Sequence, residues 1–107
     1  MNGWLGVDFD STLAIYHPGQ YPELGEPVPK MVEHVKQWLK GGYEVRIVTA
    51  RASEPDQVKL IEEWCLKHVG RKLRVTDKKD FDMLYLFDDR CIQVERNTGR
   101  LITDEEW

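Results

Sequence analysis

Residues 6–13 of the chain read G-V-D-F-D-S-T-L and follow the apolar residues Trp4 and Leu5. The run from Trp4 to Val7 predicts a short buried strand, and two carboxylates, Asp8 and Asp10, come directly after it. Two carboxylates that lie close together repel each other and are costly to desolvate. Such a pair at the end of a buried strand therefore needs a proton, a metal ion or a chemical role.

Strand and helix patterns alternate along the rest of the chain. Residues 14–27 carry several Pro and Gly residues and predict a long, functional loop. Apolar residues at spacings of three and four then predict a helix from about residue 29 to Gly41, with its buried face formed by Val28, Met31, Val32, Val35, Trp38 and Leu39. A β-rich segment at 43–48 follows, and a second helix is expected between Ser53, its predicted cap, and Gly70.

Shorter strands are expected at 73–75, 83–87 and 91–94, with a turn at 97–99. Strands that alternate with helices in this way favour βαβ units. The sequence thus predicts an α/β fold, a three-layer Rossmann-like domain with a mainly parallel sheet flanked by helices.

Length and composition set the broad class of the protein. The chain has 107 residues, enough for one domain spanning 1–107, and a net charge of −4, which argues against charge-driven nucleic-acid binding. Its longest apolar run, 83–87, is far shorter than the roughly 20 residues of a membrane-spanning helix. We therefore expect a cytoplasmic protein, with Cys65 and Cys91 as free and mostly buried thiols.

Polar residues collect where the predicted strands end. Asp8 and Asp10 follow the first strand, Thr49 and Arg51 the second, Lys78 and Lys79 the third, and Asp88 and Asp89 the fourth. Parallel strands deliver their carboxyl ends to one edge of the sheet, where open α/β folds bind ligands. Several carboxylates around one point suit a hard divalent cation, best Mg²⁺, and a lysine with a hydroxyl beside it suits phosphate.

These segments resemble the four motifs of the haloacid dehalogenase (HAD) superfamily of phosphohydrolases, in the family's order. D-F-D-S-T (8–12) resembles its D-x-D-x-T motif, V-T-A-R (48–51) its hydroxyl motif, K-K-D-F-D (78–82) its lysine motif and F-D-D-R (87–90) its acidic motif. The resemblance implies Mg²⁺-dependent hydrolysis of phosphomonoesters through an aspartyl-phosphate intermediate.

The resemblance also implies a role for each matching residue. Asp8 would be the nucleophile and a metal ligand, and Asp10 the general acid and base, with its backbone carbonyl on the metal. Thr49 would bind the phosphoryl group, Lys79, preferred here over Lys78, would neutralise charge, and Asp88 would bind Mg²⁺ directly. The remaining expected residues are Asp89, acting through a metal-bound water, and Arg51 and Arg90, each either a substrate contact or an ion-pair arginine.

The spacing of the motifs leaves no room for the cap domain that many HAD enzymes carry. Only 36 residues separate Thr12 from Thr49, and a loop and one helix use them. The chain therefore resembles the small capless group, in which an open site suits a large substrate or closure by a neighbouring subunit of a homo-oligomer. F-D-D-R is also similar to the phosphatase domain of polynucleotide kinase-phosphatases, and residues 67–79 carry six Lys or Arg, which suggests nucleotides or phosphorylated nucleic acid ends as substrates.

Two other classes of function fit the same residues. One is a receiver-like phospho-acceptor domain in signalling, although the order of the acidic and lysine motifs favours the hydrolase. The other is a non-catalytic domain that binds a phosphorylated ligand or a partner, against which the intact Asp8 and Asp10 argue.

Overall fold

A computed structural model describes residues 2–107 of the chain. Its elements in chain order are β1 (Trp4–Asp8), α1 (Pro29–Lys40), β2 (Glu44–Val48), the 3₁₀ helix η1 (Ala50–Ser53), α2 (Pro55–His68), β3 (Arg74–Thr76), β4 (Met83–Phe87), β5 (Gln93–Val94) and β6 (Leu101–Ile102). The alternation of strands and helices is the one that the sequence predicts.

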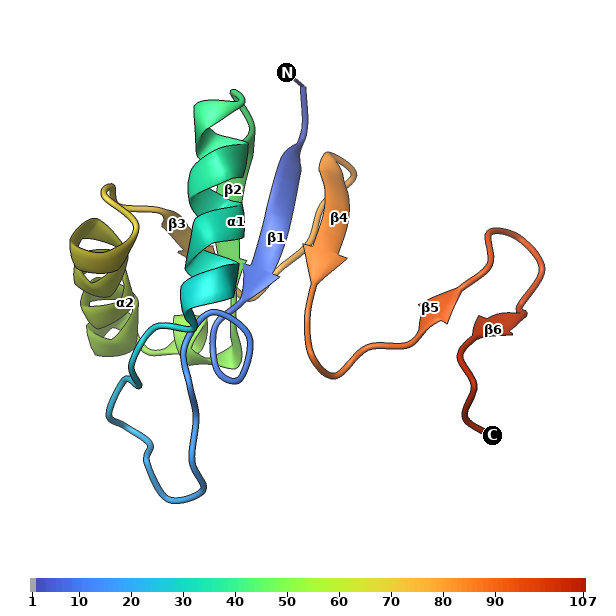
Figure 1. Ribbon diagram of the computed structural model, residues 1–107, viewed down its shortest axis with the longest axis horizontal. Helices are drawn as coiled ribbons and strands as arrows, with labels where there is room; N and C mark the ends of the chain where they lie inside the picture. The colour runs from blue at the N-terminus through green and yellow to red at the C-terminus, as the bar shows by residue number, and fades with distance from the viewer. Residues whose placement is uncertain (1) are drawn as a thin grey trace.

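The first four strands form one parallel sheet in the order β3-β2-β1-β4 (Figure 1). Strand β1 lies in the middle, with Leu5 opposite Val45 of β2 and Tyr85 of β4. Because all four strands run the same way, their carboxyl ends meet at one edge of the sheet. The chain is a small Rossmann-like α/β domain with a parallel sheet flanked by two helices and no cap, consistent with the predicted three-layer fold.

Helix boundaries follow local chemistry, with one difference from the prediction. Pro29 and Pro55 occupy the first turns of α1 and α2, where a missing N–H does no harm, and Gly41 follows the last residue of α1. The prediction that Ser53 caps α2 is wrong. The chain makes the 3₁₀ turn η1 before α2, Ser53 Oγ donates to the carbonyl of Ala50 at 3.2 Å, and Glu54 takes the cap position.

The core lies between the sheet and the two helices. Alternating residues of β1 and β2 face it, and both helices contribute to the same cluster, whose members include Leu5, Val7, Val45, Ile47, Val32, Val35, Ile61, Trp64 and Cys65. On the opposite face of the sheet, the guanidinium carbon of Arg46 lies over the buried Trp4, 4.3 Å from the centroid of its ring. The indole N–H of Trp4 donates to Asp80 at 2.8 Å. Asp80 belongs to the connection 77–82 between β3 and β4, which lies on that face and contains no helix.

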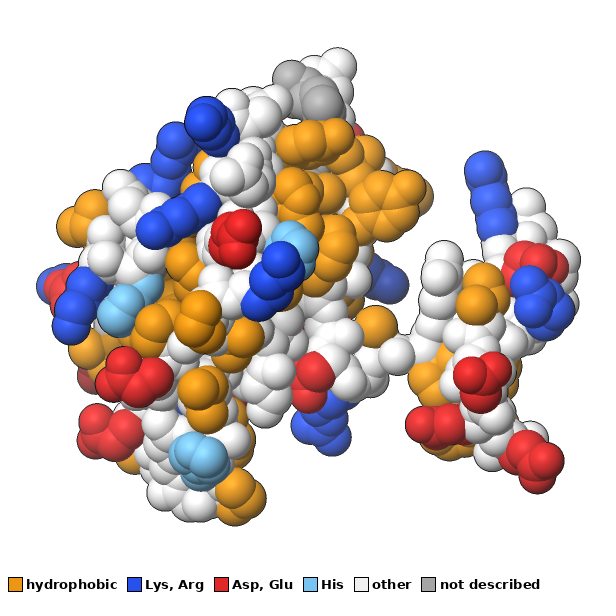
Figure 2. All heavy atoms as spheres, in the orientation of Figure 1, with side chains coloured by type: hydrophobic (Ala, Val, Ile, Leu, Met, Phe, Trp, Pro, Cys, Tyr) orange, Lys and Arg blue, Asp and Glu red, His pale blue; other side chains and the backbone are white. Residues whose placement is uncertain are grey.

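The C-terminal segment forms a separate structure. Strands β5 and β6 pair only with each other, and the hairpin stands apart from the body of the domain (Figure 2). Cys65 and Cys91 are both free; Cys65 is buried as predicted. The prediction of a mostly buried Cys91 is wrong, because this residue lies at the root of the hairpin, outside the core.

Among residues 2–107, no helix combines the length and the apolar character needed to cross a membrane.

Candidate active site at the carboxyl edge of the sheet

The turn after β1 fixes the direction of the two carboxylates. Phe9, between them, is fully buried and packs edge-on against Trp64 with ring centroids 5.0 Å apart. Its carbonyl accepts hydrogen bonds from the N–H groups of residues 12, 13 and 14 at 3.3, 2.9 and 2.9 Å. Ser11 completes the turn with a left-handed backbone at φ 67°. With Phe9 anchored in the core, both Asp8 and Asp10 face the cavity at the edge of the sheet.

Three carboxylates meet beside the end of β1. One oxygen from each of Asp8, Asp88 and Asp89 lies within 4.8 Å of the other two. The hydroxyl of Thr12 lies 3.4 Å from Asp8 Oδ2 and 3.2 Å from Asp89 Oδ1, and it accepts the backbone N–H of Asp89 at 3.2 Å. The end of β4 is thereby tied to the turn after β1, which holds the cluster together.

The electrostatics of this cluster act most strongly on Asp8. Burial, the neighbouring charge of Asp88 and the interaction with Asp89 together raise the pKa of its carboxyl from 3.8 to about 7, against a smaller lowering by the N–H of Phe9. A cluster that disfavours its own charge gains from a cation, because the cation removes the repulsion among the carboxylates. The donors are all oxygens, the type of ligand that hard divalent cations take.

Thr49 follows β2 at the same edge. Its side chain is buried, with 5% of its surface exposed, and its hydroxyl oxygen accepts the backbone N–H of Arg51 at 3.2 Å. Among the described residues, no acceptor is found for the proton of this hydroxyl. Since Thr49 lines the same cavity as Asp8, that O–H is free to donate to an anion there.

Arg51 forms the most extensive polar contact of the site. Its Nε and Nη2 donate to the two carboxylate oxygens of Asp10 at 2.8 and 3.0 Å. The remaining N–H groups donate to the carbonyls of Pro22 (2.9 Å) and Glu23 (3.2 Å) and to Gln57 Oε1 (2.7 Å). Of the two alternatives for Arg51, the structure has the ion pair. All five donors are used within the chain, so none is left for a substrate.

Of the other basic residues expected at the site, one lines the cavity and two do not. Arg90 lines the cavity with Asp8 and Asp10. Lys78 and Lys79 are exposed and are not among the residues that line it. Asp77, on the same connection, lines a smaller hollow beside Asp8, Thr49 and Asp88. The assignment of the phosphate-side lysine to Lys79 stays a prediction.

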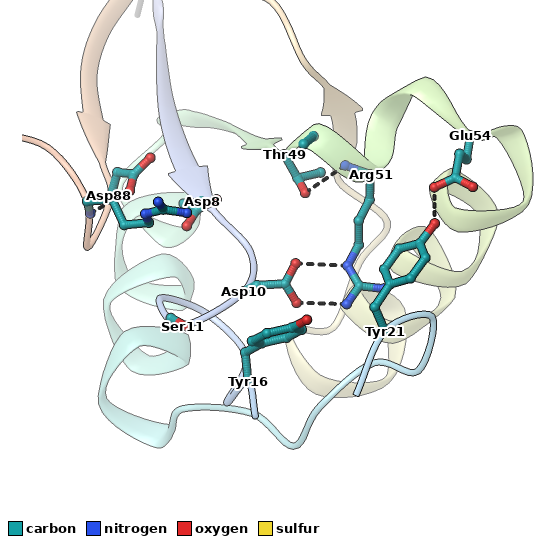
Figure 3. Close-up of a pocket in the computed structure, with 11 residues that line it drawn as sticks. Asp8, Asp10, Ser11, Tyr16, Tyr21, Thr49, Arg51, Glu54 and Asp88 are labelled. Atoms are coloured by element: carbon teal, nitrogen blue, oxygen red, sulfur yellow. Dashed lines mark hydrogen bonds and ion pairs between the residues drawn. The ribbon is translucent and has the colours of Figure 1, made fainter. Parts of the chain in front are cut away.

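The carboxylates open into a cavity of about 660 Å³ (Figure 3). Besides the expected residues, Tyr16, Tyr21 and Glu54 line it, and none of these was identified from the sequence. In Figure 3 both tyrosines come from the loop after β1; Tyr16 lies beside Asp10, and Tyr21 lies beside Arg51 with its hydroxyl toward Glu54. The predicted functional loop at 14–27 pointed to this region, but not to its aromatic residues.

Comparison with models of known protein families and with curated proteins gives no match to this sequence. Among solved structures, the fold is similar to a conserved protein coded by a locus of Bacteroides thetaiotaomicron. The two share 23% sequence identity at a TM-score of 0.65, over 85% of this chain and 78% of the other. This likeness supports the fold alone.

Proposed function

We propose that the protein is a capless, Mg²⁺-dependent phosphohydrolase of the HAD type. The observation that carries the proposal is the cluster of Asp8, Asp88 and Asp89, with three carboxylate oxygens within 4.8 Å of one another beside the free hydroxyl of Thr49. A site of this kind attracts a divalent cation and, with it, a phosphate group.

The cation would be held by Asp8, Asp88 and the backbone carbonyl of Asp10, with Asp89 acting through water. When bound, it would neutralise charge on the phosphoryl oxygens and on the nucleophile. Without a cation, the carboxylates of the cavity would repel a phosphate dianion. Cation and substrate should therefore bind together.

The chain's own residues would carry the reaction in two steps. In the first, an Asp8 oxygen attacks phosphorus, the P–O bond to the leaving group breaks, and Asp10 gives its proton to the leaving oxygen, so that an alcohol departs. In the second, Asp10 takes a proton from water, the water oxygen attacks phosphorus, and the P–O bond to Asp8 breaks. Inorganic phosphate leaves and the Asp8 carboxylate is regenerated.

The ion pair with Arg51 bears on the part assigned to Asp10. Arg51 makes one hydrogen bond to each Asp10 oxygen, at 2.8 and 3.0 Å, and each carboxylate oxygen can accept a second one. The side chain of Asp10 is 28% exposed and lines the cavity, so its oxygens are accessible to a leaving group or a water. Arg51 thus orients the carboxylate without enclosing it.

The same ion pair also defines a second candidate function. If Arg51 kept Asp10 from exchanging protons, Asp8 could still accept a phosphoryl group, and the protein would be a phospho-acceptor or a phospho-ligand binding domain. A phosphorylated protein that accumulates without release of phosphate would indicate this alternative. The cytoplasmic location and the homo-oligomer stay predictions of the sequence.

The proposal is tested by phosphate release from aryl phosphate, mononucleotides, sugar phosphates and 3′- or 5′-phosphorylated oligonucleotides, with and without Mg²⁺. We expect release that requires Mg²⁺ and that Asp8→Asn abolishes. Release that survives a chelator, or that Asp8→Asn retains, would contradict the site described above.

A further inference from the structure

The loop between β1 and α1 is a fixed wall of the cavity. Arg51 and Gln57 hold the carbonyl of Pro22, at 2.9 and 3.3 Å, and the indole N–H of Trp64 donates to the carbonyl of Gly25 at 2.9 Å. At Gly25 a Cβ atom would lie 1.7 Å from the carbonyl oxygen of Ile15. The two backbone segments of the loop therefore approach each other too closely for any residue other than glycine at this position. A loop tied down at these points presents its side chains in set positions.

Tyr21 is held on this wall from two sides. Its hydroxyl donates to the carboxylate of Glu54, and the Arg51 guanidinium lies over its ring, 4.9 Å from the centroid. Tyr21 as a residue is nevertheless 45% exposed and lines the cavity, so Arg51 and Glu54 leave part of it accessible there. Tyr16 lines the cavity from the same loop, beside Asp10 (Figure 3). The Arg51 guanidinium that lies over the Tyr21 ring is paired with the Asp10 carboxylate and has no N–H left to donate to a ligand.

The cavity is larger than its proposed chemistry requires. Its volume of about 660 Å³ is within the range of pockets that enclose whole small molecules, far more than a phosphate group and one cation need. The part beyond Asp10 presents two tyrosine rings, and aromatic rings held in place favour the stacking of a planar group.

We propose that Tyr16 and Tyr21 form a stacking wall for a planar aromatic ring in the leaving group of the substrate. The inference rests on the proposed phosphohydrolase function and narrows its substrate class. The substrates are phosphomonoesters of nucleosides or of aryl alcohols, rather than phosphates of sugars or of other aliphatic alcohols. In this arrangement the phosphate lies at Asp8 and Thr49, and the ring lies against the loop.

The test measures binding of phosphonates, which cannot be hydrolysed, to the wild-type protein with Mg²⁺ by isothermal titration calorimetry. Phenylphosphonate and methylphosphonate carry the same anion and differ in the ring. We expect phenylphosphonate to bind more tightly by about fivefold or more. A nucleoside 5′-phosphonate is the third probe. Tighter binding of this probe than of phenylphosphonate indicates a ring one sugar away from the phosphate, and the reverse indicates an aryl ester.

Matched variants locate the ring-binding surface. Tyr16→Leu should remove most of the preference for the ring, Tyr16→Phe should keep it, and Tyr85→Leu, on the exposed edge strand β4 and not among the residues lining the cavity, should change nothing. Tyr21→Leu provides the same test if Tyr16→Leu does not fold.

Equal binding of the phenyl and methyl compounds, no binding of either, or a preference that survives both leucine variants would overturn the stacking wall. The proposed function would fail in a different experiment, by the absence of Mg²⁺-dependent phosphate release. Release without any preference for aromatic esters would retain the phosphohydrolase and reject only this inference.

Discussion

Replacing Asp8 by Asn should make the metal-free protein more stable while it removes the proposed nucleophile. In the folded chain, burial and the charge of Asp88 raise the pKa of Asp8 from 3.8 to about 7, whereas in the unfolded chain the carboxyl keeps its ordinary value. The folded state therefore holds the proton more tightly than the unfolded state. The stability that this proton contributes is present below about pH 4 and is lost as the pH rises through 7.

The structure sets the size of the effect. The interval from 3.8 to about 7 corresponds to about 4 kcal/mol if taken in full, at ~1.36 kcal/mol per pKa unit. The carboxyl is only half buried, so solvent screens much of this penalty, and about 1–2 kcal/mol is a more realistic value. Asn has nearly the same shape and no charge. At pH 8 the variant should gain about 1–2 kcal/mol, or roughly 5–10 °C in Tm for a domain of this size.

The assay is urea unfolding in the presence of a chelator at pH 8 and at pH 3, with Asp104→Asn, an exposed carboxylate on the C-terminal segment, as the control. The gain from Asp8→Asn should be close to zero at pH 3, because there the carboxyl is protonated in both the folded and the unfolded chain, and the control should show no gain at either pH. Mg²⁺ should stabilise the wild type and not the variant. A variant that is no more stable than wild type at pH 8, or equally stabilised at both pH values, would show that the folded state does not raise the pKa of Asp8.

Three further predictions follow from other residues. Arg51→Met should destabilise the protein by about 3 kcal/mol in urea unfolding, because it leaves Asp10 without its partner and releases the loop carbonyls; a loss below about 1 kcal/mol would show that the ion pair is dispensable. If Lys79 is the phosphate-side lysine, Lys79→Ala should lower kcat/KM about 100-fold and Lys78→Ala only slightly, and the opposite result would exchange their roles. A thiol reagent should label the exposed Cys91 at once and Cys65 only on unfolding, since burial raises the Cys65 pKa to about 12; rapid labelling of both would contradict the packing of α2.

Much of the fold could be predicted from the sequence because its local signals agree. Apolar spacing, the prolines at 29 and 55 and the glycines after α1 each place the same boundaries that the structure has. The parallel order of the strands then brought Asp8, Thr49 and Asp88 to one edge. The sequence alone is sufficient to predict a helix or strand whose boundaries are set by its own residues.

Long-range contacts could not be predicted from these local sequence signals. The hydrogen bonds of Arg51 join a 3₁₀ turn to Asp10, 41 residues earlier, and to the carbonyls of Pro22 and Glu23, 29 and 28 residues earlier. No local pattern indicates such partners. The proposed stacking wall also depends on long-range contacts, since Arg51 and Glu54 hold Tyr21 in position. Likewise, the exposure of Cys91 depends on where the C-terminal hairpin stands, which its sequence does not specify.

In the proposed reaction, Asp8 attacks phosphorus with a divalent cation beside it. The most direct measurement is Mg²⁺-dependent phosphate release by the wild type, with Asp8→Asn, verified as folded, measured in parallel on the same panel of phosphomonoesters. We expect release from at least one ester that stops on chelation and is absent in the variant. Release that persists in Asp8→Asn, or none from a folded wild type that binds Mg²⁺, would contradict the proposed role of Asp8.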